Sequence, residues 1–206
     1  HTATPVRSVT RLASGVRLAG DAGELGEYDA VVMAAHGDQT LAMLDQPSEA
    51  EARLLGAFGY QANDAWLHTD PAIMPKRRAV WSSWNHLTAQ SVDGRQPVSV
   101  TYWMNRLQSL ATDTDVMVTL NPLREPAPET VIRRQQYDHP VFDQAAVAAQ
   151  AALPEIQGVD RIWYCGSYHG YGFHEDAFSS AVRVAERLGA PPPWAGDARP
   201  IDSKVP

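Results

Sequence analysis

Cysteines and long apolar runs are scarce in this chain of 206 residues, and each scarcity excludes a class of protein. Cys165 is the single cysteine, which excludes an internal disulfide and any metal site built from several cysteines. A chain without disulfides fits a reducing compartment, so we expect a cytoplasmic protein. No run approaches the roughly 18 apolar residues of a transmembrane helix, so we expect no membrane span.

Positive charge is also sparse. The chain has 17 lysines and arginines against 24 aspartates and glutamates, a formal net charge of −7, and its arginines are scattered along the sequence. A basic stripe, the signature of nucleic-acid or anionic-membrane binding, is therefore absent, and no nucleic-acid partner is expected. A small-molecule substrate fits this composition better.

The glycine-rich fingerprint of dinucleotide-binding proteins, G-x-G-x-x-G after a strand, occurs nowhere in the chain. The acidic residue usually found about 20 residues beyond it has no counterpart either. The sequence also begins His-Thr-Ala-Thr-Pro-Val, without an initiator methionine, and enters an expected strand almost at once. We therefore expect a piece of a longer protein.

The first 60 residues indicate strands followed by short helices. Residues 6–12 and 15–18 alternate like a half-exposed hairpin. Residues 28–35 are continuously apolar from Ala30 onward, which predicts a strand buried on both faces. Asp38 is the expected cap of one short helix. Ser48 and Glu51 form the capping-box pattern that opens another.

The middle of the chain, from about residue 66 to 137, is rich in β-branched and aromatic residues and predicts an antiparallel sheet. One of its turns is expected at Asp93-Gly94. An alanine-rich helix is expected next, closed by Pro154. The expected strands cover residues 65–68, 79–84, 98–104, 116–120 and 131–136, and the helix covers residues 143–153.

The most informative segment, residues 161–189, predicts a short strand, a glycine-rich aromatic loop and a helix that begins with acidic residues. Such a turn aims free backbone N–H groups and the positive end of the helix dipole at one point, which suits an anionic or carbonyl-bearing ligand. Glycines permit close approach of a flat ligand, and aromatic rings offer surfaces around it. The glycines are Gly166, Gly170 and Gly172, and the rings belong to Tyr168, His169, Tyr171 and Phe173.

The helix itself carries an apolar stripe at near-helical spacing, which predicts packing on a sheet. The stripe is formed by Phe178, Val182, Ala185 and Leu188 and is widened by Ala177, Ala181 and Val184. Gly189 is its expected C-terminal stop. We expect residues 191–206 to form a surface tail.

The run Gly172-Phe173-His174-Glu175-Asp176-Ala177, after a strand that ends in Cys-Gly-Ser, resembles the C-terminal flavin motif of the flavin-containing amine oxidase superfamily. More narrowly, the whole chain resembles a group of bacterial FAD-dependent proteins identified as predicted amine oxidases. Residues 81–86, 102–105 and 139–142 are similar to that group's substrate-domain signatures.

The resemblance implies a site for non-covalent FAD made largely of backbone. It places the start of the last helix against the flavin pyrimidine edge, where reduction builds up negative charge. It places Gly166 and Ser167 beside the ribityl chain and pyrophosphate, and Val6 beside adenine. The residues implied at the pyrimidine edge are Gly172, Phe173, His174, Glu175, Asp176 and Ala177.

The resemblance also implies an α/β (α+β-like) fold. Residues 1–45 and 155–190 are expected to form the second half of a Rossmann-like FAD domain of the glutathione-reductase type, and residues 46–154 an inserted, mainly antiparallel substrate domain. The implied activity is that of an FAD-dependent oxidoreductase, with hydride transfer from substrate to flavin N5. The absent phosphate-binding half is the implied partner, so we expect this chain alone to be inactive and not to retain FAD.

Several side chains have a structural interpretation beside a chemical one. Glu175 and Asp176 are typical of a first helical turn, where they complement the dipole, and Cys165 on an apolar strand is typical of a small hydrophobe. Cys165, His169, His174 and Glu175 do not have the spacing of a closed metal site, so no metal is expected. Lys76 lies in a basic turn that favours solvent exposure over a place near flavin N5.

No catalytic base is identifiable. Aromatic and polar residues on the expected strands are either core or candidate substrate contacts, namely Trp84, Asn85, His86, Trp103 and Asn105. Two lysines and a tryptophan-rich sheet favour an apolar substrate, so a desaturase or isomerase acting on fatty-acyl or polyene chains is an alternative to an amine oxidase. A third hypothesis is a non-catalytic module that forms a homodimer through an exposed apolar patch.

Overall fold

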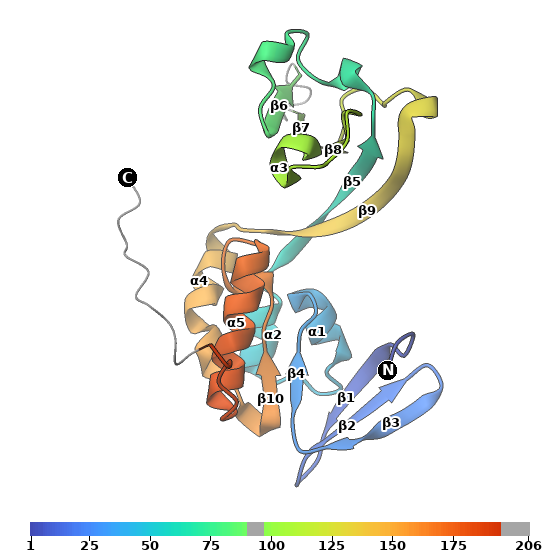
Figure 1. Cartoon of the computed structure of the whole chain (residues 1–206). Coiled ribbons are helices and arrows are strands. Elements are labelled where there is room, and N and C mark those ends of the chain that lie inside the picture. Colours follow the sequence, from blue (N-terminus) through green and yellow to red (C-terminus); the bar gives the residue numbers. More distant parts are fainter. Residues whose placement is uncertain (90–96, 195–206) are drawn as a thin grey trace. The chain divides into compact units, whose positions relative to one another are not determined.

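The chain divides into two compact units, a discontinuous unit of residues 1–60 and 140–206 and an inserted unit of residues 61–139. The computed structural model describes residues 1–89 and 97–194 (Figure 1). The expected Asp93-Gly94 turn lies outside the described residues, as does most of the expected tail. Residues 46–60 and 140–154, which the sequence assigned to the inserted domain, pack within the discontinuous unit.

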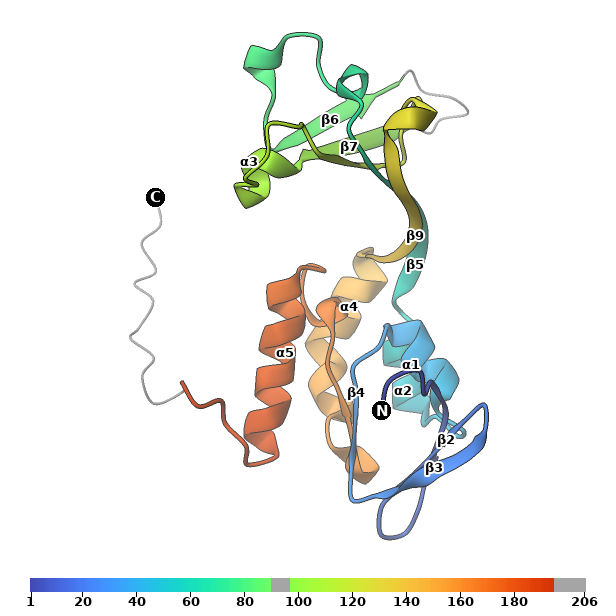
Figure 2. The same ribbon diagram turned by 45° about the vertical axis from the view of Figure 1, so that its right-hand side comes forward.

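Two small sheets form the discontinuous unit. Strands β1 (Val6–Arg11), β2 (Val16–Gly20) and β3 (Gly23–Tyr28) form an antiparallel meander, which confirms the predicted hairpin. Strand β4 (Val31–Met33) pairs in parallel with β10 (Ile162–Tyr164), although 131 residues of sequence separate Val31 from its partner Ile162 (162 − 31 = 131). Both views show these two strands side by side (Figures 1 and 2).

The prediction that residues 28–35 form a strand buried on both faces is wrong. The strand has three residues, and Val32 is 43% exposed, whereas Met33 is buried. Successive side chains of a strand point to opposite faces, so Val32 lies on the face opposite Met33. Among the described residues, β4 has a hydrogen-bonded neighbour on one side alone, β10, and one of its faces stays open.

The described part of the discontinuous unit also contains four α-helices: α1 (Gly37–Met43), α2 (Glu49–Leu55), α4 (Gln144–Ala152) and α5 (His174–Arg187). Short 3₁₀ turns lie between them at η4 (Leu153–Ile156), η5 (Val159–Arg161) and η6 (Ser167–His169). Figure 2 shows α4 and α5 side by side. Within residues 1–89 and 97–194, no helix is long and apolar enough to cross a membrane.

Helix caps follow the sequence in part. The Ser48 hydroxyl accepts a hydrogen bond from the Glu51 amide at 3.2 Å, and the Glu51 carboxylate accepts one from the Ser48 amide at 2.8 Å, so the predicted capping box is confirmed. Asp143 likewise caps α4. The prediction that Asp38 caps α1 is wrong, because the N-cap is His36 and the Asp38 carboxylate accepts from its neighbour's amide instead.

A continuous core joins the helices and strands of the discontinuous unit. Each large apolar side chain that is fully buried contributes about 1.5–3 kcal/mol relative to an exposed one. The largest fully buried apolar residues are Val9, Val16, Leu54, Leu55, Leu153, Ile162, Tyr164 and Tyr168.

A five-stranded sheet in the order β6-β7-β8-β5-β9 forms the inserted unit, and the β6–β7, β7–β8 and β8–β5 pairs are antiparallel as predicted. Strands β5 and β9 both continue into the discontinuous unit. The strands are β5 (Gly59–His68), β6 (Trp84–Thr88), β7 (Val98–Trp103), β8 (Met117–Leu120) and β9 (Val131–Val141), with the helix α3 (Met104–Gln108) and the 3₁₀ turns η1 (Pro71–Ile73), η2 (Arg78–Val80) and η3 (Pro128–Thr130).

The predicted strand at residues 79–84 is wrong. Arg78–Val80 is a 3₁₀ turn, and β6 begins at Trp84. The Arg78 guanidinium lies 4.6 Å from the centroid of the Trp81 ring and pairs with the carboxylate of Asp115, so side-chain contacts take the place of a strand ladder.

Candidate functional site

The loop between β10 and α5 approaches its own helix so closely that it needs glycine. A Cβ atom at Gly170 would collide with the carboxylate of Asp176, and a Cβ at Gly166 would lie 2.8 Å from a ring carbon of Tyr168. Gly172 has φ +92°, a conformation that residues with a side chain rarely adopt. The loop shape is thus fixed by backbone and by small residues.

Asp176 organises the turn from loop to helix. Its carboxylate accepts hydrogen bonds from the amides of Tyr171 at 3.0 Å and Phe173 at 2.9 Å. Phe173 occupies the N-cap and has no side-chain acceptor, so the acid at the third helical position satisfies amides that a serine cap would otherwise leave open. Asp176 is therefore committed to the loop, which agrees with its structural interpretation.

The first turn of α5 keeps two free donors. The Gly172 amide donates to the Ser167 carbonyl at 3.2 Å, and the Asp176 and Ala177 amides donate to the Phe173 carbonyl at 3.1 and 3.2 Å. The amides of His174 and Glu175 have no hydrogen-bond partner in the part of the chain that the structure describes. Both lie at the positive end of the helix dipole.

The aromatic rings of the loop separate into two groups. Tyr171 is 83% exposed and Phe173 is 59% exposed, so both offer ring surface beside the start of α5. Tyr168 is 1% exposed and packs on Phe58, with 5.0 Å between ring centroids. The expectation that Tyr168 offers its ring to a ligand is therefore wrong, because the ring completes the core.

Two residues that the sequence analysis missed hold the loop from behind. Gln150 of α4 donates from Nε2 to the carbonyls of Tyr168 at 3.0 Å and Gly170 at 2.5 Å. Ser180 of α5 accepts from the Gly166 amide at 2.9 Å. A signal was present in the sequence for Gln150, a polar residue inside an alanine-rich helix, whereas Ser180 lies in a helix with many other polar residues and does not stand out.

The apolar stripe predicted on α5 is exposed in part. Val184 is 4% exposed and packs into the unit, but Phe178 is 51% and Leu188 is 46% exposed. The helix therefore packs through Ser180 and Val184, and the prediction that Phe178 and Leu188 are buried is wrong for the residues described. Its C-terminal stop is confirmed, since Gly189 has φ +79°.

Val6, implied at adenine by the resemblance, lines a hollow of about 310 Å³ on the antiparallel meander. Leu18, Leu25 and Tyr28 supply its other apolar walls. The hollow and the β10–α5 loop both belong to the discontinuous unit.

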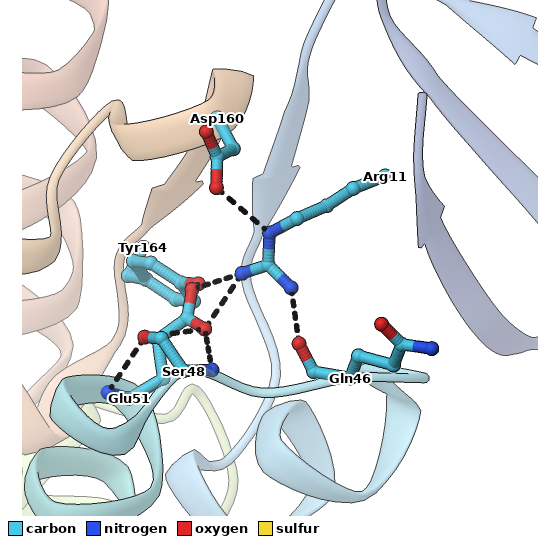
Figure 3. Close-up of polar contacts among 6 residues, drawn as sticks. All are labelled: Arg11, Gln46, Ser48, Glu51, Asp160 and Tyr164. Atoms are coloured by element: carbon cyan, nitrogen blue, oxygen red, sulfur yellow. Dashed lines mark hydrogen bonds and ion pairs between the residues drawn. The ribbon is translucent and has the colours of Figure 1, made fainter. Parts of the chain in front are cut away.

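A buried ionic network fixes the end of β10 (Figure 3). Arg11 of β1 donates from Nη2 to both carboxylate oxygens of Glu51 at 2.5 and 2.6 Å, and Tyr164 of β10 donates from its hydroxyl to the same carboxylate. Ser48 donates to it as well, and Asp160 pairs with Arg11 at 3.3 Å. Burial alone raises the pKa of Glu51, but the hydrogen bonds and the arginine outweigh it and hold that pKa below its usual range.

The remaining chemical candidates are a buried thiol and an exposed lysine. Cys165 is 4% exposed and burial raises the pKa of its thiol, so the thiolate is disfavoured. Lys76 is exposed, as its basic turn predicted. No group of three or more histidine, cysteine, aspartate or glutamate residues within 1–89 and 97–194 has a metal-binding arrangement.

The sheet of the inserted unit separates the five candidate substrate residues. Trp84 and His86 lie on one face, where they pair with Tyr102 and Val100, and both are exposed. Asn85 points to the opposite face, is 7% exposed, and hydrogen-bonds to the backbone of Ser82 at 2.7 and 3.0 Å.

The other two candidates support loops. Trp103 packs edge-to-face on Trp81, with 5.4 Å between ring centroids. Its Nε1–H donates a hydrogen bond to the Asp115 carboxylate at 3.0 Å. Asn105 accepts from the Val116 amide at 2.7 Å and donates to the Thr114 carbonyl at 2.8 Å. Trp84 and His86 thus have side chains free for a ligand, whereas Asn85, Trp103 and Asn105 are engaged in the fold.

The face that carries Trp84 and His86 is largely apolar. Val100 pairs with Leu120 across β7 and β8, and Tyr102 pairs with Val118. A hollow of about 540 Å³ near the strand ends is lined by Val98, Val100 and Leu120 with polar groups at its rim. The opposite face is buried and carries the hydrogen-bonded side chains of His68, Thr101 and Thr119.

Residues 1–189 match the model of the family of flavin containing amine oxidoreductases, and the chain belongs to this family. No curated protein matches it. Solved structures of the same fold are putrescine oxidase with bound putrescine, cyclohexylamine oxidase from Brevibacterium oxydans IH-35A and a fatty acid isomerase from P. acnes that produces CLA.

These structures share the fold at low sequence identity. Putrescine oxidase is 14% identical with a TM-score of 0.58, over 91% of this chain and 48% of that one. Cyclohexylamine oxidase is 14% identical with a TM-score of 0.56, over 90% and 48%. The isomerase is 13% identical with a TM-score of 0.58, over 90% and 47%. The chain spans about half the length of each.

The mixed helix and strand fold predicted from the sequence is confirmed, and so is the family. A flavin is the cofactor that the family implies. The three solved relatives act on different compounds by name, so the fold they share does not single out one reaction.

Proposed function

We propose that this chain is the C-terminal part of an FAD-dependent oxidoreductase, and that the start of α5 binds the pyrimidine edge of the flavin. The observation that carries the proposal is the pair of free amides at His174 and Glu175, beside the exposed rings of Tyr171 and Phe173. Donors fixed at a helix N-terminus stabilise negative charge on a ligand without reorganisation.

The residues around this point fit a flat, partly anionic group. Gly166, Gly170 and Gly172 place no Cβ atom at three positions of the loop, and Asp176 turns its carboxylate toward loop amides rather than toward the ligand side. When bound, FAD supplies two-electron redox chemistry by accepting a hydride equivalent from the substrate. The chain's own part is to bind, orient and electrostatically favour the cofactor. Val6 is the proposed adenine contact, and Gly166 and Ser167 the proposed contacts of the ribityl chain and pyrophosphate.

We further propose that the phosphate-binding half of the site comes from outside this chain. Val32 on β4 and Phe178 on α5 leave apolar surface open in the discontinuous unit, and β4 has a hydrogen-bonded neighbour on one side alone among the described residues. A companion strand and helix would cover this surface. The 206 residues alone are then colourless, inactive and unable to retain FAD. We also propose a cytoplasmic location for the whole protein.

The test compares a longer protein, extended upstream of His1, with two glycine variants. Gly172 and Gly189 have similar positive φ values, +92° and +79°, so Gly172→Val and Gly189→Val bring similar backbone strain. We expect the Gly172→Val protein to lose most of its bound flavin and the Gly189→Val protein to keep it, as measured by flavin absorbance per mole of protein. Equal flavin content in the two variants would refute the proposed position of the flavin edge.

A second pair tests the loop itself. Asp176→Asn weakens the acceptor of the Tyr171 and Phe173 amides, whereas Glu175→Gln removes an adjacent charge whose side chain contacts Ser179. We expect Asp176→Asn to weaken FAD binding by about tenfold, equivalent to one charge-assisted hydrogen bond. Glu175→Gln is the matched control, and a larger loss there would contradict the assignment of Asp176.

The apolar sheet face of the inserted unit favours a second candidate reaction. Trp84, Tyr102, Val100 and Leu120 offer ring and aliphatic surface, without a charged residue at these positions to pair with a substrate ammonium. This supports an apolar substrate, such as a fatty-acyl or polyene chain, over an amine. Anaerobic bleaching of the flavin by aliphatic amines but not by unsaturated fatty acids would decide for the amine oxidase. The non-catalytic module would be favoured by two results together: the chain forms a stable dimer, and it takes up no FAD even when the companion half is present.

A further inference from the structure

A small cavity of about 140 Å³ lies between α4 and α5, behind the loop that joins β10 to α5. Figure 2 shows the two helices side by side, with the loop at one end of them. Gln150 and Leu153 line the cavity from one helix and its end, His169 lines it from the loop, and Arg183 and Arg187 line it from α5.

His169 brings a polar atom without a partner into this cavity. Its Nε2 is buried and has no hydrogen-bond partner among the described residues. Burial and the nearby charge of Arg183 lower the pKa of His169 to about 4, so the ring is neutral at pH 7. A neutral imidazole in the Nε2–H tautomer donates one hydrogen bond. A buried donor without an acceptor is destabilising, so an acceptor placed here would be favoured.

Two guanidinium groups face the same space. Arg183 and Arg187 are one helical turn apart on α5, so their side chains lie on one face. Neither forms an ion pair with an acidic residue in the described part of the chain. Arginine near a helix C-terminus complements the dipole, but two full charges exceed the half charge of the helix end, so the cavity as a whole attracts anions.

We propose that this cavity binds a small tetrahedral oxyanion of the phosphate class, held by His169 Nε2–H and the guanidinium groups of Arg183 and Arg187. The donors exclude a metal cation, and their charge disfavours an apolar ligand. Gln150 lines the same cavity and holds the carbonyls of Tyr168 and Gly170, so the bound oxyanion lies beside the residue that fixes the loop. This site is separate from the proposed flavin site and its test needs no flavin.

The direct test is a titration of the 206-residue chain with sodium phosphate against sodium chloride at matched ionic strength. Binding is followed by calorimetry and by the ring nitrogen and carbon signals of His169 in NMR spectra. We expect saturable heat and a saturable shift of the His169 ring signals with phosphate and none with chloride. Glycerol 3-phosphate is used as a second ligand to distinguish free phosphate from a phosphate ester. If the cavity accepts the ester, glycerol 3-phosphate will compete with phosphate for binding.

Variants show whether the cavity is responsible. Arg183→Gln and Arg187→Gln should each raise the dissociation constant for phosphate at least about tenfold, the loss of one charge-assisted contact. His169→Phe should abolish the selectivity for phosphate over chloride. His169→Gln, which keeps an N–H donor, should retain part of that selectivity. Arg133→Gln, on β9 of the inserted unit, is the control with the same loss of charge and should bind phosphate unchanged.

The proposal is overturned if phosphate and chloride give the same linear response. It is equally overturned if the folded double variant of Arg183 and Arg187, verified by circular dichroism, binds phosphate as tightly as the unchanged chain.

Discussion

The hydroxyl of Tyr164 on β10 donates a hydrogen bond to the buried carboxylate of Glu51 on α2, across 113 residues of sequence. The same carboxylate accepts hydrogen bonds from the guanidinium of Arg11 on β1 (Figure 3). Strands β1 and β10 and helix α2 are therefore linked through the Glu51 carboxylate. Tyr164 directly precedes Cys165 and Gly166, where the loop toward α5 begins. The network therefore fixes the start of the proposed flavin loop.

Removing that charge should be costly. Glu51→Gln leaves Arg11 without its carboxylate in a half-buried place, and breaking a buried pair costs about 3–5 kcal/mol. We expect a loss at the lower end of this range because Arg11 retains Asp160 and the Gln46 carbonyl. Urea unfolding measures this loss of unfolding free energy. The control is Glu155→Gln, which breaks an exposed pair with Arg53 and should change stability by less than about 1 kcal/mol.

The same carboxylate should make stability depend on pH. Its pKa in the folded chain is held below the unfolded value of about 4.3, so its contribution is complete above that pH and is lost as pH falls through the folded pKa. The difference in unfolding free energy between the unchanged chain and Glu51→Gln should therefore be constant from pH 7 to about pH 5 and shrink below about pH 4. A difference that grows on acidification would contradict this.

The tight loop predicts a contrast between two glycines. Gly170→Ala places a methyl group against the Asp176 carboxylate and should cost about 1–3 kcal/mol, because the carboxylate holds loop amides and cannot move freely. Gly59→Ala adds a methyl group in open space and should change stability by no more than about 0.5 kcal/mol. Thermal or urea unfolding of both variants gives the comparison.

Neighbouring residues of β6 should respond differently to substitution. Asn85→Ala removes a buried amide that holds the Ser82 backbone and the Thr101 carbonyl, and should destabilise the chain by about 1–3 kcal/mol. Trp84→Leu, at a site 49% exposed, should cost less than about 1 kcal/mol. In the longer protein, Trp84→Leu should raise KM more than Asn85→Ala does, because Trp84 lies on the face that we propose contacts substrate.

Local patterns predicted much of the fold. The capping box at Ser48, the C-terminal glycine of α5 and most strands of the antiparallel sheet follow from rules that act within a few residues. Prediction failed where distant groups compete with those rules. Arg78 pairs with Asp115 and lies over Trp81, which replaces the expected strand by a 3₁₀ turn, and β4 is open on the face that a buried strand would cover.

For the candidate site, the sequence by itself determined its location and its chemical type: glycines and acids in a strand–loop–helix segment indicate a backbone site for a partly anionic ligand. Only the tertiary structure decided which groups are available there. The Asp176 carboxylate takes the Tyr171 and Phe173 amides, Tyr168 completes the core, and His174 and Glu175 keep free donors. The physical reason is that backbone hydrogen bonds are exclusive, and which of them form depends on contacts between residues that the sequence keeps apart.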